Sequence, residues 1–220
     1  KPLYQRSLIV FGGPLANFLL AIVIFLSIYM FIGKDFTPAL IDEVQKDSPA
    51  EIAGLMKNDV IIEIDNNKVE SILDVSKYIA MSTSEYLDFK ISRYDEQMLF
   101  KVKPNLVPSE DNLGNKINKR MVGIKITPYN NEINHVKLGP AQALIQSVEE
   151  VYFVTTSSLK YLGSMLIGKG DSSQLGGPIR IAKISGQVAE FGIIPFLSMT
   201  AYISISLGLI NLFPIPMLDG

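Results

Sequence analysis

The charged residues of this chain are absent from two long stretches, one near each end. Residues 7–33 and 191–218 contain no Asp, Glu, Lys, Arg or His, although 19% of the whole sequence is charged. A helix rises about 1.5 Å per residue, so either stretch is long enough to cross a hydrocarbon core of about 30 Å. This segregation predicts a mixed fold class, in which membrane α-helices flank a small α+β domain.

Composition excludes several classes of protein. The sequence contains no cysteine, which excludes disulfides, thiolate nucleophiles and Cys-type metal sites. A net charge of -2 is too small to indicate a nucleic-acid partner. The first apolar stretch is too long for a signal peptide of the usual form, and it lacks a clear small-residue cleavage site.

The charges at the ends of the first apolar stretch predict how the chain enters the membrane. Lys1 and Arg6 precede it, whereas Lys34 and Asp35 cancel after it. The positive-inside rule therefore favours a cytoplasmic start and an outward exit, so the region between the two stretches is expected outside the cytoplasm. The second stretch would return the chain inward. Pro195 and Gly208 interrupt that stretch, so its helix is expected to begin near residue 196.

The second stretch ends in polar and helix-breaking residues. Asp219 is an ionisable group at the edge of an apolar run, and such a group is by default a functional-site candidate. Pro214 and Pro216 lack backbone donors and push the chain out of helical geometry. Asn211 could supply amide hydrogen bonds inside the resulting opening. The residues leave a second interpretation open, in which the helix simply ends at the interface and Asp219 lies in water.

The first stretch contains a polar residue among small and apolar ones. Asn17 follows the Gly12-Gly13-Pro14 segment, where small residues permit close helix approach. A lone amide in an apolar helix more often makes an interhelical hydrogen bond than it serves in catalysis. The residues alone therefore favour a structural role for Asn17.

The region between the stretches shows the patterns of one small domain over residues 37–128. Ser48 is expected to cap a short helix that starts at Pro49, with Glu51 completing a capping box and Gly54 ending the helix. A second helix is expected over residues 73–81. Alternating apolar residues predict strands around 60–64, 87–91, 100–102 and 122–126, with turns at 66–67 and 94–96 and an Asn-rich loop over 108–119.

Residues 129–190 are expected to form an amphipathic helix and a linker. Pro140 suits a first helical turn, and apolar residues then recur at helical spacing, interrupted by Glu149, Glu150 and Lys160. This helix is expected to lie at the membrane interface or to pack on the other helices rather than to span. His135 is expected in an exposed loop. The domain boundaries that follow are 1–36, 37–128, 129–190 and 191–220.

Three segments resemble motifs of one protein family. NLFPIPMLDG at residues 211–220 resembles the Asn-x-x-Pro-x-Pro-x-Leu-Asp-Gly motif of the site-2 proteases. GPLANF at 13–18 is similar to the Gly-Pro-x-Ala-Asn-Phe segment of that family's second membrane helix, and GGPI at 176–179 to the segment before its third. SPAEIAGL at 48–55, followed by NDVIIEID at 58–65, resembles PDZ domains. The order of these segments along the chain fits the site-2 proteases of the bacterial regulator-of-sigma-E type, which have an intervening PDZ region.

This resemblance implies a zinc metalloendopeptidase that cleaves single-span membrane proteins within the bacterial inner membrane. It implies that Asp219 is the third zinc ligand, and that Asn211, together with Pro214 and Pro216, positions the substrate strand. Asn17 would support the site or contact substrate. The PDZ-like domain would lie outside the cytoplasm, where it could bind a peptide.

The sequence departs from the family at the catalytic helix. The family carries His-Glu-x-x-His, whereas this chain has one histidine, His135, and no such motif. The chain is therefore expected to be an internal piece of the enzyme that holds no complete catalytic set. An alternative is a non-catalytic membrane adaptor that displays a PDZ-like module. A transporter half, with Asn17 and Asp219 as ion-coupling groups, is less supported because no inverted repeat is visible.

Overall fold

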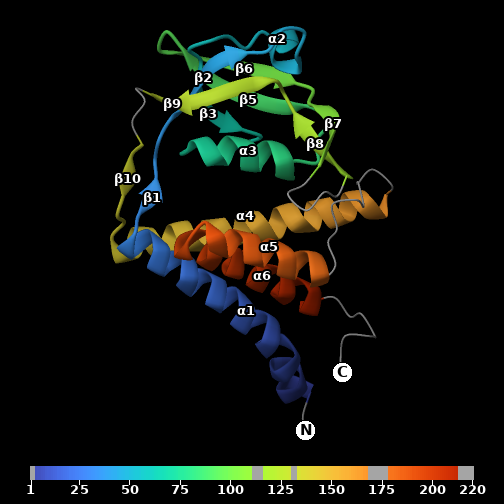
Figure 1. The fold of residues 1–220 in the computed structure, drawn as a ribbon. Helices are drawn as coiled ribbons and strands as arrows, with labels where there is room; N and C mark the ends of the chain where they lie inside the picture. Colours follow the sequence, from blue (N-terminus) through green and yellow to red (C-terminus); the bar gives the residue numbers. More distant parts are fainter. Residues whose placement is uncertain (1–2, 111–115, 130–132, 168–177, 213–220) are drawn as a thin grey trace. The chain divides into compact units, whose positions relative to one another are not determined.

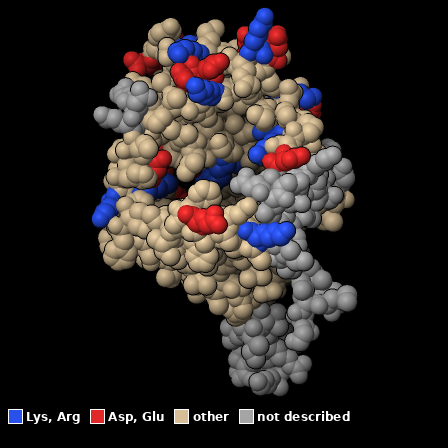
Figure 2. All heavy atoms as spheres, viewed as in Figure 1, with Lys and Arg blue, Asp and Glu red and all other residues tan. Residues whose placement is uncertain are grey.

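The computed structural model describes residues 3–110, 116–129, 133–167 and 178–212 (Figure 1). The chain divides into two compact units. The helical unit comprises Lys1–Lys34, Lys137–Leu159 and Gly176–Gly220, and the sheet unit comprises Asp35–Val136 and Lys160–Leu175. On the face drawn in Figure 2, charged side chains gather over the strands of the sheet unit, whereas the helices of the other unit show few of them.

Four helices supply the described part of the helical unit: α1 (Leu3–Phe31), α4 (Pro140–Leu166), α5 (Pro178–Glu190) and α6 (Ile193–Leu212). Within α1 and α6, Phe11–Phe31 and Ile193–Leu212 are long and apolar enough to cross a membrane. A core cluster joins three of the helices and contains Ala21 and Phe25 of α1, Val151 and Val154 of α4, and Ala201 and Ile205 of α6. The predicted helix starting at Pro140 is confirmed, whereas α5 was not predicted as a separate helix.

Prolines take different places in the two apolar helices. The predicted start of the second helix near residue 196 is wrong, because α6 begins at Ile193. Pro195 lies in the first turn, where a missing N–H breaks no intrahelical bond. Pro14 lies in the interior of α1. A proline there cannot donate to the carbonyl four residues earlier, so the Val10 carbonyl lacks its usual helical donor.

An antiparallel sheet with strand order β6-β5-β3-β2-β9 forms the main layer of the sheet unit, and β4 pairs with β3. The strands are β2 (Ala39–Val44), β3 (Val60–Ile64), β4 (Asn67–Lys68), β5 (Leu87–Arg93), β6 (Glu96–Val102) and β9 (Ile124–Pro128). Two helices accompany them, α2 (Pro49–Ala53) and α3 (Ile72–Met81). The core is rich in fully buried aliphatic side chains around Phe89.

The predicted helix ends in the sheet unit are confirmed in most details. Ser48 caps α2 and accepts a hydrogen bond from the Glu51 amide, and Gly54 ends the helix with a φ of 94°. The predicted capping box at α2 is wrong, because the Glu51 carboxylate accepts instead from the Asp47 amide, at 2.6 Å. A complete capping box occurs at α3, between Ser71 and Asp74.

Two other features of the sheet unit differ from the predictions. The expected Asn-rich loop over 108–119 is wrong, because most of its described residues belong to a hairpin of β7 (Asn105–Glu110) and β8 (Lys116–Met121). Its period-2 pattern is hidden, because β7 is exposed on both faces. The exposed His135 lies in a short strand rather than a loop, since β10 (His135–Val136) pairs with β1 (Lys34–Asp35).

The two chain segments that enter and leave the sheet unit run side by side. Phe36 donates its amide to the Asn134 carbonyl at 2.8 Å, and the Asn134 amide donates to the Thr37 hydroxyl oxygen at 2.9 Å. Thr37 is fully buried, and Asp35 accepts from its amide at 2.9 Å. The sheet unit is therefore closed at its base by hydrogen bonds between its own two ends.

Candidate functional site on the paired apolar helices

The sequence-predicted site residues divide into two groups. Asn17 lies in α1, and Asn211 lies in the last turn of α6. Pro214, Pro216 and Asp219 lie outside the described residues. The site can therefore be built from the seam between α1 and α6, at the end of α6 that leads into the 211–220 motif.

Gly208 is a point of close approach in this seam. A Cβ added to Gly208 would lie 3.2 Å from the Cβ of Asn17, 3.2 Å from the Pro14 carbonyl oxygen and 3.3 Å from the Phe18 ring. These contacts are tighter than ordinary van der Waals packing, and one of them is to backbone. Glycine lets the two helix backbones approach, which is how small residues promote helix pairing in membranes.

A hydroxyl bonds the two helices one turn away from that contact. The Ser204 hydroxyl, which is 5% exposed, donates to the Asn17 main-chain carbonyl at 2.8 Å. An interhelical hydrogen bond at Asn17 was predicted, but its backbone makes this bond rather than its side-chain amide. Ser204 was missed, and Gly208 was interpreted only as an interruption of the second apolar stretch. Their spacing, small-x-x-x-small in an apolar helix, is the sequence signal that could have revealed them.

The side-chain amides of the two asparagines are available at this seam. Asn17 is half-buried and Asn211 is exposed, and neither amide makes a hydrogen bond within the described part of the chain. Asn211 follows Ser204 and Gly208 on one helical face, at spacings of four and three residues. Each amide can therefore donate a hydrogen bond to, and accept one from, a group outside the described residues.

The register of the two helices brings the asparagines to the same end of the seam. Gly208 lies against Asn17, and the ring centroids of Tyr202 and Phe25 are 5.4 Å apart. Because the later residue of α6 contacts the earlier residue of α1, the two helices run antiparallel. The last turn of α6, with Asn211, is consequently level with the turn of α1 that contains Pro14. The Val10 carbonyl, which lacks its helical donor, belongs to that turn.

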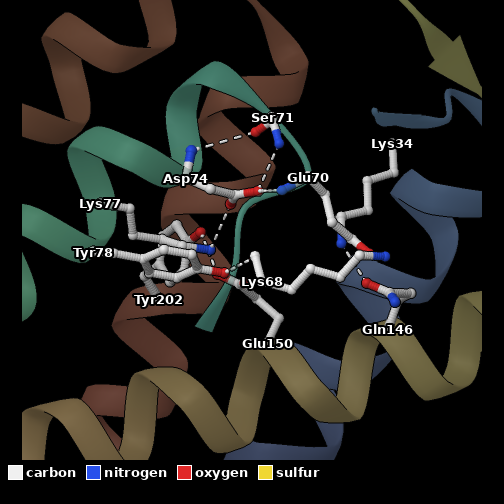
Figure 3. Close-up of polar contacts among 10 residues, drawn as sticks. All are labelled: Lys34, Lys68, Glu70, Ser71, Asp74, Lys77, Tyr78, Gln146, Glu150 and Tyr202. Carbon is white, nitrogen blue, oxygen red and sulfur yellow. Dashed lines mark hydrogen bonds and ion pairs between the residues drawn. The ribbon is translucent and has the colours of Figure 1, made fainter. Parts of the chain in front are cut away.

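Polar contacts also fix α4 to the other two helices (Figure 3). The Tyr202 hydroxyl of α6 donates to the Glu150 carboxylate of α4 at 2.9 Å. Lys34, which follows α1, donates to the side-chain oxygen of Gln146. The Leu138 amide, just before α4, donates to the Tyr29 carbonyl at 3.0 Å. Hydrogen bonds therefore link α4 both to α6 and to the end of α1.

A model of peptidase family M50 matches residues 1–220. This chain belongs to peptidase family M50. The family resemblance stated from the motifs is thereby confirmed. Relatives include proteins named "Putative zinc metalloprotease" from Agrobacterium fabrum, 33% identical over 99% of this chain, and from Rickettsia conorii, 34% identical over all of it. Metalloprotease MmpA of Caulobacter vibrioides is 30% identical over the whole chain.

The M50 relatives are longer than this chain. It covers 58% of the Agrobacterium and Caulobacter proteins and 61% of the Rickettsia protein. Among solved structures, the PDZ domain of an SdrC-like protein from Listeria monocytogenes is 22% identical. It covers 41% of this chain and 88% of its own length, with a TM-score of 0.33. That score is too low to carry an argument about the sheet unit.

The described residues do not form a zinc site. None of their His, Cys, Asp and Glu side chains gather in a group of three or more that could hold a metal ion. Asp219, whose carboxylate is a ligand type that zinc accepts, lies outside the described residues. The seam therefore provides amides and helix packing rather than metal ligands.

One buried pair of charged groups anchors the sheet unit. Arg93 donates to both Asp59 carboxylate oxygens, at 2.7 and 2.8 Å, and to the Gly54 carbonyl at 2.8 Å. The Asp59 side chain is fully buried and that of Arg93 is 16% exposed. Hydrogen bonding to Asp59 raises the pKa of Arg93. This pair holds the end of α2 and the start of β3 to β5.

A cavity of about 570 Å³ lies near this anchor, between β2 and α2. Asp42, Glu43 and Glu51 place carboxylates along it, and Lys57 is the basic residue of its lining. Hydrogen bonding from Lys57, with a smaller contribution from Lys125, holds the pKa of Asp42 below its usual range. One of the three carboxylates is thus ionised and paired with two neighbouring lysines.

Proposed function

We propose that this M50 chain is part of a membrane-embedded zinc metalloendopeptidase that cleaves membrane-spanning proteins within the bilayer. The family and the names of the relatives support a metalloprotease role. The two apolar helices support a place in a membrane. The chain would supply one zinc ligand, and it would also supply the surface that positions the substrate.

The α1–α6 seam is the observation that carries this proposal. It joins the 13–18 segment, through Pro14, Asn17 and Phe18, to the part of α6 that leads directly into the 211–220 motif. Residues far apart in sequence are thus brought to one place. The α1 segment resembles one site-2 protease motif, and the α6 segment directly precedes the other. A chance resemblance in two unrelated helices would give no reason for them to pack at those residues.

Unpaired amides at the seam suit an extended peptide. A substrate segment inside a membrane exposes backbone N–H and C=O groups that need partners. Asn17 and Asn211 can each donate and accept, and the Val10 carbonyl can accept. The segment with Pro214 and Pro216 would continue this edge in an extended form. Substrate strands would lie along it.

Zinc would be held only in part by this chain. A catalytic zinc takes three protein ligands and a water, and Asp219 would be one of the three. The sequence contains one histidine and no His-Glu-x-x-His. We therefore propose that two histidines and the glutamate base come from outside these 220 residues.

The sheet unit would lie outside the cytoplasm of a bacterium and bind peptides there. The positive residues before the first apolar stretch favour this orientation in the inner membrane. β9 is the end strand of its sheet, with β2 on one side, and α3 contacts it. A peptide could add to the open edge of such a strand, as it does in PDZ domains.

The test uses the protein as encoded in its genome, reconstituted in lipid vesicles with a model single-span substrate. Asp219→Ala should abolish both bound zinc and cleavage. Asn211→Ala should retain zinc and weaken cleavage, because its amide holds substrate rather than metal. Full zinc and full cleavage in Asp219→Ala would disprove the ligand assignment. A wild-type protein that inserts but neither binds zinc nor cleaves would favour the membrane adaptor.

A further inference from the structure

Helix α4 carries a second apolar surface besides the one that packs on α1 and α6. Its buried side includes Ala143, Ser147, Val151 and Val154. The buried side packs in the core cluster that α4 shares with α1 and α6. The second surface is not covered by any part of the chain that the structure describes.

This second surface is a continuous stripe, which we call the α4 stripe. Ile145 is 57% exposed and Tyr152 is 70% exposed, and between them Val148 is 46% exposed. The stripe consists of Leu144, Ile145, Val148, Tyr152 and Leu159. At 100° per residue, these positions fall on one flank of the helix, next to the buried side.

The opposite flank of α4 is polar. Gln142 and Glu149 are exposed there, and the Glu149 position lies roughly 100° from that of Val148. The helix therefore has three strips in cross-section: a packed one, an exposed apolar one and a polar one. An amphipathic helix that only covers a protein core needs the first and the last of these.

The position of α4 is fixed by its bonds to helices that are apolar on the outside. Glu150 accepts from Tyr202 of α6, and Gln146 accepts from Lys34 at the end of α1. The outer faces of α1 and α6 expose large apolar side chains, among them Leu19 and Leu207. Lipid or protein that covers the outer faces of α1 and α6 would therefore also lie next to α4.

We propose that the α4 stripe is embedded in the acyl chains at the bilayer interface, with the polar flank of α4 in water. This rests on the proposed membrane insertion of α1 and α6. Large exposed apolar patches mark interaction surfaces, and a helix with one apolar and one polar flank suits an interfacial position. The charged residues on the polar flank beside the stripe, Glu149 and Lys160, carry opposite charges. The stripe therefore binds lipid without any requirement for anionic headgroups.

The absence of cysteine allows a direct test in the full chain. Single cysteines at Tyr152, Glu149 and Leu19 are labelled with a small fluorophore, and the protein is placed in phosphatidylcholine vesicles. Quenching by brominated acyl chains reports contact with lipid, and quenching by iodide reports contact with water. Tyr152 and Glu149 are matched, because both are exposed and three residues apart on one helix.

The label at Tyr152 should be quenched by brominated lipid and shielded from iodide, and the label at Glu149 should show the reverse. Adding phosphatidylglycerol should leave both unchanged. Equal iodide quenching at the two positions, with Leu19 quenched by lipid, would overturn the α4 stripe while leaving membrane insertion intact. Iodide access to Leu19 would overturn insertion itself. Shielding of Tyr152 from both quenchers, with energy transfer between labelled copies, would assign the stripe to a second copy instead.

Discussion

The sheet unit and the helical unit differ in how each is packed internally. The sheet unit buries bulky side chains such as Phe89 and Ile91 and anchors its loops with the Arg93–Asp59 pair. Between α1 and α6, the close contact at Gly208 and the Ser204 hydrogen bond add to the burial of Phe25 and Ile205. Other large apolar side chains of these helices, such as Leu19 and Leu207, are exposed. This difference is the one expected from the proposed insertion of α1 and α6 into a membrane. Water rewards burial of large apolar groups, whereas lipid does not, so helices in lipid associate through close backbone contact and hydrogen bonds.

The largest effect is expected in the sheet unit, at Arg93. Arg93→Ala leaves the Asp59 carboxylate buried without its cation, and removing one partner of such a pair costs about 3–5 kcal/mol. Urea unfolding of the full chain in detergent, followed by hydrogen exchange of the β5 amides, measures this loss. Lys101→Ala is the control, because the Lys101–Asp88 pair is exposed and should contribute little. Equal effects of the two substitutions would remove the distinction between anchor and surface pair.

A smaller effect is expected from widening the seam at Gly208. Gly208→Ala places a methyl group against the Pro14 carbonyl and the Asn17 side chain, and overpacking of this kind costs about 1–3 kcal/mol. Gly186→Ala in α5 is the matched control, because a Cβ there would meet nothing within 4 Å. Unfolding of both variants in mixed detergent micelles, followed by circular dichroism, gives the comparison. If Gly208→Ala proves as stable as Gly186→Ala, the close approach of α1 and α6 is not what holds them.

The smallest effect is expected from the interhelical hydroxyl. Ser204→Ala removes one hydrogen bond between helices, and such bonds contribute about 0.6 kcal/mol on average in membrane proteins. Ser206→Ala is the control, because the Ser206 hydroxyl donates to the Tyr202 carbonyl of its own helix at 2.9 Å. The same unfolding assay applies. A loss at Ser204 as large as that at Arg93 would show that the seam depends on polar bonds rather than on packing.

Local signals in the sequence were enough to predict many elements. The caps at Ser48 and Gly54 and the helix over 73–81 depend on neighbouring residues, and the structure confirms them. The two apolar stretches were visible because they exclude charge over more than a membrane thickness. The helix start at Ile193 was misplaced, because Pro195 was taken as a boundary although a first turn tolerates it.

Long-range features could not be predicted in the same way. The contact of Gly208 with Asn17 depends on the antiparallel register of two helices separated by the whole sheet unit. The hairpin of β7 and β8 was missed because β7 is exposed on both faces and so shows no alternation of buried and exposed positions. The roles proposed for Pro214, Pro216 and Asp219 stay predictions, since these residues lie outside the described part of the chain.

The closed base of the sheet unit has a consequence for how such a protein can change over evolution. Phe36 and Thr37 are bonded to Asn134, so the ends of the sheet unit are neighbours. Because these two ends lie close together, the chain leaves and returns to the flanking helices at nearly the same place, whatever the size of the unit between them. Units whose ends lie close together tolerate insertion and exchange well. The 35–136 segment could therefore be replaced, duplicated or lost without forcing a new path on the helices, which makes it a natural place for related chains to diverge.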